Sequence, residues 1–359
     1  MKMFEAFDLC GIELSNRLVM SPMTRSRATG NIPNDLMVKY YSQRADAGLI
    51  ITEGVAPSAN GLGYPRIPGI YNKKQIDGWR KITDAVHEKG GKIFIQIMHT
   101  GRISHSENME KNTTILAPSA ISASGKMHTD SRGMLAFPVP RKMTLSEIAQ
   151  AQLEHVKAAE NAIISGFDGV ELHGANGYLI DQFINPGSNH RTDIYGGNKE
   201  KRCKFAIEVA QQVASAIGEN KTGIRLSPYG TYNDMALFDE MDDTFEYLAG
   251  EFGKLNLNYI HIVDHSSQGA PQVTDTVKSK IQKSFGGNII ASGGLNKEKA
   301  GLILSEQKAN LVAFGQAFLA NPDMVNKFKK NIPLNQPNYE YFFTPGERGY
   351  NDYPVVLDK

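Results

Sequence analysis

Short apolar segments rich in Val and Ile recur along the chain, each closed by small or polar residues. Most of them are followed by a segment with helical periodicity, which is typical of alternating strands and helices. Eight such segments predict eight strands and therefore a (β/α)8 TIM barrel, an α/β fold that forms one domain over residues 1–359. The predicted strands are Arg17–Ser21, Leu49–Thr52, Lys92–Ile97, Gly169–His173, Gly223–Leu226, Tyr259–Val263, Asn288–Ala291 and Leu311–Phe314.

Residue patterns between and after the predicted strands indicate where helices, a long insertion and a packed tail lie. Thr144 and Glu147 form a capping-box pattern that predicts the start of a helix, and Gly166 is placed to end it. The interval between the third and fourth strands is too long for one helix, so the stretch 102–141, rich in Ser, Pro and Asn, predicts an inserted excursion over the barrel mouth. The tail after Pro333 is too aromatic for a disordered terminus, and we expect it to pack back onto the barrel.

Composition narrows the class of protein. Hydrophobic residues make up 41% and charged residues 21%, which is ordinary for a soluble domain with a large core. Lys and Arg number 39 against 38 for Asp and Glu, so no strong field attracts nucleic acid or anionic lipid. The sequence shows neither a signal-peptide pattern nor an apolar run long enough to span a membrane. Two cysteines, Cys10 and Cys203, supply no disulfide framework, and we expect a cytoplasmic protein that acts on small molecules.

Polar residues gather where the predicted strands end. The carboxyl ends of barrel strands are where catalytic groups collect, whereas a single polar residue there often only satisfies loop carbonyls. Five such ends together favour an active site. They are Ser21-Pro22-Met23-Thr24, Thr52-Glu53-Gly54, Gln96-Ile97-Met98-His99, the stretch from Glu171 through His173 and Asn176 to Tyr178, and Arg225-Leu226-Ser227-Pro228.

Glycines follow the last two predicted strands. Gly293 and Gly294 end the seventh strand segment, and Gly315 and Gln316 end the eighth. In barrels these two loops often hold a phosphate with backbone N–H groups, because glycine lets the backbone approach the oxygens. One glycine pair alone is more often turn chemistry, but two in these positions indicate a phosphorylated substrate or cofactor.

Several motifs together resemble one known family. They are Asn16-Arg17, Ser21-Pro22-Met23-Thr24-Arg25-Ser26-Arg27, Tyr40-Tyr41-x-Gln43-Arg44-Ala45, the block from His173 to Phe183, Arg191-Thr192-Asp193-x-Tyr195-Gly196-Gly197, Ala320-Asn321-Pro322-Asp323 and Gly349-Tyr350-x-Asp352-Tyr353-Pro354. This set resembles the old yellow enzymes, FMN-dependent ene-reductases that include alkene reductases similar to N-ethylmaleimide reductase. The resemblance covers nearly the whole chain, and the block that starts at His173 is its most specific part.

The resemblance implies a reaction and a cofactor site. It implies that activated C=C bonds of α,β-unsaturated carbonyls, maleimides and nitroalkenes are reduced with hydride from NADPH or NADH in a ping-pong cycle. Thr24 would then contact the flavin O4, Gln96 the pyrimidine edge, and Arg225 the N1–O2 region, where its permanent charge favours an anionic reduced ring. The full set of implied FMN-binding residues is Pro22, Met23, Thr24, Gly54, Gln96, Arg225, Gly293, Gly294, Gly315 and Gln316.

The resemblance also implies the catalytic residues. His173 and Asn176 would donate hydrogen bonds to the carbonyl or nitro oxygen of the substrate, and Tyr178 would protonate the α-carbon. Tyr64, Met98 and Phe343 match substrate-pocket positions. Three positions depart from the usual pattern: Gln316 replaces an arginine at the FMN phosphate, Met98 replaces a tryptophan, and Phe343 replaces a tyrosine.

Two other functions compete with this interpretation. A metal-dependent TIM-barrel hydrolase would use Glu171 and His173, which share one strand face, with His261, Asp264 and His265 at the sixth strand end. Against it, the best-matched block pairs its histidine with Asn and Tyr, which are poor metal ligands, and we expect no metal. A non-catalytic ligand-binding barrel is the second alternative, and the complete set of catalytic residue types argues against it.

Overall fold

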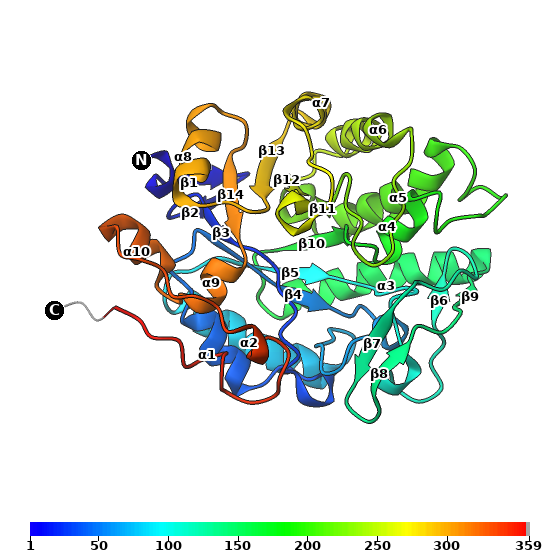
Figure 1. The fold of residues 1–359 in the computed structure, drawn as a ribbon, viewed down its shortest axis with the longest axis horizontal. Helices are drawn as coiled ribbons and strands as arrows, with labels where there is room; N and C mark the ends of the chain where they lie inside the picture. The colour runs from blue at the N-terminus through cyan, green and yellow to red at the C-terminus, as the bar shows by residue number, and fades with distance from the viewer. Residues whose placement is uncertain (357–359) are drawn as a thin grey trace.

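Eight parallel strands close into a barrel in the computed structural model, which describes residues 1–356 (Figure 1). Each strand pairs with its neighbours in chain order, and β10 pairs with β5 and β11. The predicted (β/α)8 barrel is confirmed, with strand limits that shift by a few residues. The strands are β3 (Leu18–Met20), β4 (Leu49–Val55), β5 (Ile93–Ile97), β10 (Gly169–Gly174), β11 (Thr222–Leu226), β12 (Tyr259–Val263), β13 (Asn288–Ser292) and β14 (Leu311–Phe314).

Helices surround this barrel and pack their apolar faces onto it (Figure 1). The predicted capping box is present, because Thr144 accepts from the Glu147 backbone and Glu147 accepts from the Thr144 backbone. Asn72, Asn198 and Asn296 cap three other helices through side-chain oxygens. The helices are α1 (Asp35–Ser42), α2 (Lys73–His87), α3 (Leu145–Ile164), α4 (Leu179–Ile184), α5 (Lys199–Ile217), α6 (Met241–Lys254), α7 (Asp275–Phe285), α8 (Lys297–Ser305), α9 (Gln316–Ala320) and α10 (Met324–Lys330).

A short hairpin packs against the apolar interior of the barrel. It consists of β1 (Phe7–Leu9) and β2 (Ile12–Leu14), which pair antiparallel. Leu9 and Leu14 are fully or almost fully buried in one cluster with strand residues that include Phe94. The interior of the barrel near the hairpin is therefore packed with apolar side chains, and the predicted site residues lie at the opposite, carboxyl ends of the strands.

The stretch between β5 and α3 forms the predicted excursion. Two short strands, β6 (Leu116–Ala117) and β9 (Arg141–Lys142), pair with each other, and between them β7 (Lys126–Thr129) and β8 (Gly133–Ala136) form a hairpin. Arg66 forms an ion pair with Asp130 at the hairpin tip. The excursion is thus attached to a loop from the barrel mouth.

The carboxyl-terminal segment packs back onto the barrel, as predicted. Tyr350 is fully buried and stacks on Tyr40 with ring centroids 4.1 Å apart. The Arg27 guanidinium donates to the carbonyls of Tyr341 and Phe342, each at 2.7 Å. This segment, coloured red in Figure 1, lies against α1. Its burial places Phe343 at the edge of the barrel mouth, where it helps to line the cavity described below.

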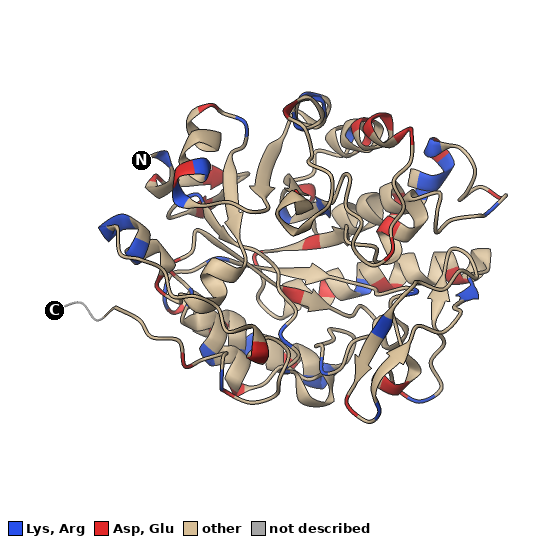
Figure 2. Cartoon of the chain, in the orientation of Figure 1, with Lys and Arg blue, Asp and Glu red and all other residues tan. Residues whose placement is uncertain are grey.

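Charged residues of both signs are interspersed over the outer helices (Figure 2). This distribution agrees with the balanced charge of the sequence, because neither sign dominates the helical surface. Of the helices that the structure describes, none is long and apolar enough to cross a membrane.

Candidate active site

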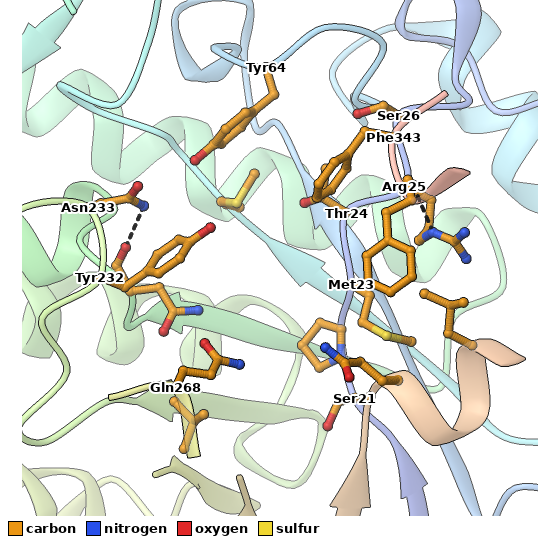
Figure 3. Close-up of a pocket in the computed structure, with 18 of the residues that line it drawn as sticks. Ser21, Met23, Thr24, Arg25, Ser26, Tyr64, Tyr232, Asn233, Gln268 and Phe343 are labelled. Atoms are coloured by element: carbon orange, nitrogen blue, oxygen red, sulfur yellow. Dashed lines mark hydrogen bonds between the residues drawn. The ribbon is translucent and has the colours of Figure 1, made fainter. Parts of the chain in front are cut away.

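The carboxyl ends of the strands surround a cavity of about 1620 Å³. Small-ligand sites usually measure roughly 300–1,000 Å³, so this cavity has room for more than one ligand. Figure 3 shows the space between Tyr232 and Asn233 on one side and Met23 and Phe343 on the other. Every site residue predicted from the sequence lines it except Gly54; those that do are Pro22, Met23, Thr24, Tyr64, Gln96, Met98, His173, Asn176, Tyr178, Arg225, Gly293, Gly294, Gly315, Gln316 and Phe343.

Gly54 is not among the residues that line the cavity. A Cβ atom at this position would come within 2.5 Å of the Met98 sulfur, so the absence of a side chain lets Met98 pack against β4. The β4–β5 register also shifts between Ile51 and Gly54. The structure thus shows Gly54 packed against Met98, and the contact with the cofactor that the resemblance implies for Gly54 stays a prediction.

Four polar residues on, or just after, two neighbouring strands form what we call the mouth cluster: His173, Asn176, Tyr178 and Arg225. His173 on β10 is in register with Arg225 on β11. The rings of His173 and Tyr178 meet edge to face with centroids 4.8 Å apart. The sequence block that begins at His173 therefore brings its histidine, amide and phenol to one side of one cavity, together with a guanidinium from the next strand.

A tight turn after β10 explains this convergence. Asn176 has φ 59° and Gly177 has φ 75°, and Asn and Gly are the residues that adopt this left-handed conformation at least cost. The Gly177 N–H donates to the Asp181 carboxyl at 2.8 Å, and the Asn176 N–H donates to the Ser227 hydroxyl at 2.9 Å. The turn reverses the chain, so that Tyr178, at the start of α4, returns over His173.

Burial sets the protonation states of the mouth cluster. Burial, together with the nearby Arg225 charge, lowers the pKa of His173 well below its ordinary value, so the imidazole is neutral. Burial raises the pKa of the Tyr178 phenol, which therefore keeps its proton. Burial also lowers the pKa of Arg225, but Glu171 opposes this shift, and a guanidinium remains protonated at neutral pH.

Two nitrogen atoms of the mouth cluster are buried without a hydrogen-bond partner, His173 Nδ1 and Arg225 Nε. An unpaired buried polar atom usually costs about 1–3 kcal/mol, and most such atoms are paired in folded proteins. Both residues line the cavity. Their unpaired atoms indicate that a ligand completes the hydrogen bonding here.

Below the mouth cluster lies a second polar set, Gln96, Glu171, His261 and Ser292, which we call the buried polar chain. Gln96 Nε2 donates to Glu171 Oε1 at 2.7 Å, and His261 Nδ1 lies 2.9 Å from Glu171 Oε2. His261 Nε2 lies 3.0 Å from the Ser292 hydroxyl. Burial lowers the pKa of His261, so the ring is neutral and its single N–H, on Nδ1, donates to Glu171. Glu171 uses one N–H of Gln96 Nε2, so the second N–H and the carbonyl oxygen of this amide are left for a ligand in the cavity.

These contacts bear on the hydrolase alternative. Glu171 and His261 are hydrogen-bonded to each other. Asp264 forms an ion pair with Lys278, and His265 contacts Asn176. Within residues 1–356, no three His, Cys, Asp or Glu side chains come together as a set of metal ligands. The residues on which that alternative depended therefore make separate polar contacts.

The glycine loops form the end of the cavity near β13 and β14. Gly293 has φ 113°, and a Cβ there would lie 1.9 Å from the Asp264 carbonyl oxygen, so only glycine fits. Gln316, at the start of α9, accepts a hydrogen bond from the Tyr339 hydroxyl at 3.0 Å. Its amide N–H group is then the end available to an anion. Tyr339 thus orients Gln316, the residue that replaces the arginine usual at this position.

The cavity lining also includes residues that were not identified as substrate-site residues from the sequence, among them Tyr232, Asn233 and His265. These three come from the loops after β11 and β12. Asn233 donates to the Asn176 carbonyl at 2.8 Å, and His265 stacks on Tyr232 with centroids 6.2 Å apart. The sequence offered His265 only as a loop histidine or a metal ligand. A run of polar residues after Pro228 gave no sign that this loop returns to the mouth cluster.

Comparisons with known proteins are consistent with this geometry. Residues 2–335 match the model of the NADH:flavin oxidoreductase / NADH oxidase family. The chain is 42% identical over 351 residues to a probable flavin mononucleotide-dependent alkene reductase of Leishmania infantum, covering 96% of this chain and 95% of the relative. It is 40% identical over 352 residues to the putative 12-oxophytodienoate reductase 2 of Oryza sativa subsp. japonica, covering 96% and 92%. A structure of morphinone reductase in complex with tetrahydroNAD superposes with TM-score 0.94 at 36% identity, covering 100% of this chain and 98% of that one.

Proposed function

This chain belongs to the NADH:flavin oxidoreductase / NADH oxidase family and is an NAD(P)H-dependent FMN oxidoreductase; from that membership we propose that it reduces C=C bonds conjugated to a carbonyl or nitro group. The resemblance to old yellow enzymes is thereby confirmed at the level of the family. The observation that carries the proposal is the mouth cluster, in which two potential hydrogen-bond donors and a protonated phenol face one cavity.

The residues present fit a flavin mononucleotide. Arg225 Nε and His173 Nδ1 are unpaired and buried at the cavity wall, and the flavin ring system offers carbonyl and ring-nitrogen acceptors. Gly293, Gly294 and Gly315 border the same cavity, where backbone N–H groups can approach a phosphate. We propose that Thr24, Gln96 and Arg225 hold the ring, and that the glycine loops with Gln316 hold the phosphate.

When bound, FMN supplies the redox chemistry: it takes up hydride from the nicotinamide and passes it to the alkene carbon. Arg225 places a positive charge at the cavity wall, which favours extra electron density on a ring bound beside it. One cavity serves both substrates in this proposal, so the oxidised nicotinamide leaves before the alkene enters, which is a ping-pong scheme.

The mouth cluster then acts on the alkene. Asn176 and His173 donate to the carbonyl or nitro oxygen and draw electrons from the double bond, so that the β-carbon accepts hydride. A neutral His173 can donate through only one ring nitrogen, which makes its tautomer important. Tyr178 gives its proton to the α-carbon, and the addition across the double bond is complete. The Tyr178 hydroxyl also lies 3.1 Å from that of Tyr64.

In this proposal, the side chains that line the cavity determine which substrates fit. Met98 is buried, lines the cavity and has a flexible side chain that adapts to different ligands. Phe343 is largely exposed at the rim. Cyclic enones, maleimides and nitroalkenes are the substrate classes we propose.

We also place the protein in the cytoplasm, without nucleic-acid partners; its two free cysteines and its balanced charge support this location.

An anaerobic titration tests the proposal. The purified protein is expected to be yellow, to bleach with NADPH or NADH, and to recover its colour with 2-cyclohexenone, N-ethylmaleimide or a nitroalkene. Measuring both half-reactions with both nicotinamides also identifies the preferred donor. A flavin that bleaches but is reoxidised by none of the three acceptors would falsify the proposed substrate class.

A further inference from the structure

A loop histidine contacts the amide that we assign to substrate binding. His265 Nε2 lies 2.7 Å from Asn176 Oδ1. We propose that His265 is a positioning residue, which fixes the Asn176 amide so that its N–H group, and not its carbonyl, faces the substrate oxygen. This inference rests on the proposed function, because it assumes that Asn176 binds the carbonyl or nitro oxygen of the alkene.

The direction of this hydrogen bond follows from the groups involved. The Asn176 oxygen can only accept, so His265 must donate through Nε2. Asn and Gln amides can rotate by half a turn with little change in shape, and their orientation is decided by their neighbours. A donor at the Asn176 oxygen therefore leaves Asn176 Nδ2 as the free end. Without that donor, the amide could turn its carbonyl toward the substrate oxygen, and two acceptors would then repel each other.

The rest of Asn176 is already fixed, which leaves the amide as its mobile part. The Asn176 N–H donates to the Ser227 hydroxyl at 2.9 Å, and the Asn176 carbonyl accepts from Asn233 Nδ2 at 2.8 Å. Its φ of 59° is set by the turn with Gly177. The backbone thus holds the Cα–Cβ bond in place, and His265 supplies the contact that selects between the two amide orientations.

His265 is itself held in place by its surroundings. Its ring stacks on Tyr232 with an angle of 17° between the planes. The preceding residue, Asp264, accepts from the Ser266 backbone at 3.0 Å and pairs with Lys278 at 2.8 Å, so the start of the loop is anchored. The ring is therefore placed by contacts other than the one to Asn176, as a positioning role requires.

Charges near His265 favour a neutral ring. Burial lowers the pKa of His265, and the Arg225 charge lowers it further, whereas the Gln268 side chain and Asp264 oppose the shift. Tyr232 stacks on the ring, and the neutral His173 also interacts with it electrostatically. A neutral imidazole has one N–H, and the contact with Asn176 assigns it to Nε2. The ring then donates in a single direction.

Two substitutions separate the hydrogen bond from the packing. His265→Phe keeps an aromatic ring against Tyr232 but removes the donor. His265→Gln loses the ring but can present an amide N–H at the position of Nε2. The ligand is cyclohexanone, which carries the carbonyl but has no C=C bond to reduce, and its dissociation constant is measured on the FMN-loaded protein from the change in visible absorption. Reoxidation by 2-cyclohexenone is measured in parallel.

Cyclohexanone binding and reoxidation are expected to weaken in one variant and not in the other. His265→Phe should weaken cyclohexanone binding by about tenfold and slow reoxidation at low enone concentration by a similar factor, as for the loss of one hydrogen bond. His265→Gln should remain close to the wild type. In an Asn176→Ala background, His265→Phe should cause no further loss, because a residue that acts only through Asn176 has nothing left to orient.

Other results would overturn the inference. Equal losses in the Phe and Gln variants, or a full additional loss in the Asn176→Ala background, would show that His265 only packs the loop. Wild-type affinity in His265→Phe would overturn it while leaving the proposed function intact, provided that the wild type is reoxidised by the enone. A wild type that neither binds cyclohexanone nor is reoxidised would overturn the proposed function, and this inference with it.

Discussion

The buried polar chain and the mouth cluster lie at the same end of the barrel and share strand β10, where Glu171 and His173 are two residues apart. They differ in how their hydrogen bonds are completed. The Glu171 carboxylate has a partner at each oxygen, and both ring nitrogens of His261 are paired. In the mouth cluster, His173 Nδ1 and Arg225 Nε are buried and unpaired.

This difference separates residues that stabilise the fold from residues that take part in the reaction. Polar groups that satisfy one another can be buried without a ligand and hold neighbouring strands in register. Polar groups with free hydrogen-bonding capacity are costly in the folded protein unless a ligand completes them. We therefore expect changes in the buried polar chain to affect stability first and changes in the mouth cluster to affect the reaction first. The predictions below test this division and extend it to two other buried histidines and to the glycine loops, from the largest expected effect to the smallest.

The largest effect is expected for Tyr178→Phe in the mouth cluster. Removal of the proton donor should slow reoxidation by cyclic enones at least ~100-fold, while reduction by the nicotinamide stays near the wild-type rate. Stopped-flow absorbance of the flavin measures both half-reactions. Tyr64→Phe is the matched control, because it removes only the hydroxyl that contacts Tyr178 and should slow reoxidation by about tenfold or less. Equal slowing of both half-reactions in Tyr178→Phe would contradict the role of general acid.

Glu171→Gln is expected to act on stability. The carboxylate accepts from Gln96 and His261, whereas an amide at this position would turn its NH₂ group toward one of these donors. We expect the free energy of unfolding to fall by about 3 kcal/mol, measured by chemical denaturation at a fixed excess of FMN. The same exchange at the exposed Glu298 should change it by ~0.5 kcal/mol or less. A fully stable Glu171→Gln protein would show that the buried polar chain is not a structural unit.

Two further buried histidines make the interior sensitive to acid. Burial lowers the pKa of His155 to about 4 and that of His99, which stacks on it, to about 3, from an ordinary value of 6.5. The unfolded chain therefore binds protons first as the pH falls, so the free energy of unfolding decreases from about pH 6.5 toward pH 4. His155→Phe keeps the ring beside Phe205 and removes one titrating group. Its stability loss between pH 7 and pH 5 should be smaller than that of the wild type by about 2 kcal/mol, measured by denaturation at both pH values. An equal loss in both proteins would contradict a neutral, buried His155.

The sequence predicted the mouth cluster better than its surroundings, for a physical reason. His173, Asn176 and Tyr178 are close along the chain, and Arg225 ends the next strand, so the barrel pattern alone brings them together. The buried polar chain joins four separate strands, and its contacts depend on registers that no local pattern gives. The close packing of Met98 on Gly54 likewise depends on the β4–β5 register, which no local pattern gives.

The loops were the least predictable part. Tyr229, Asn233 and Asp234 all have positive φ, so the loop after β11 follows a path that depends on tertiary contacts and not on local propensity. That path brings Tyr232 to the ring of His265 and Asn233 to the carbonyl of Asn176. Strand ends could be read from the sequence because apolar runs mark them, whereas the loops that complete the cavity carry no such periodicity.

The smallest effect is expected at the glycine loops, where Gln316 stands in place of an arginine. Gln316→Arg should tighten FMN binding by about tenfold, because a charged donor near a phosphate adds more than the neutral amide it replaces, while the contact with Tyr339 is lost. The dissociation constant can be measured from the quenching of FMN fluorescence, and the gain should shrink as salt is added. Gln316→Leu is the control, since it removes the amide without adding charge and should not tighten binding. An unchanged or weaker affinity in Gln316→Arg would mean that the backbone N–H groups of the glycine loops, and not this side chain, provide the hydrogen bonds that hold the phosphate.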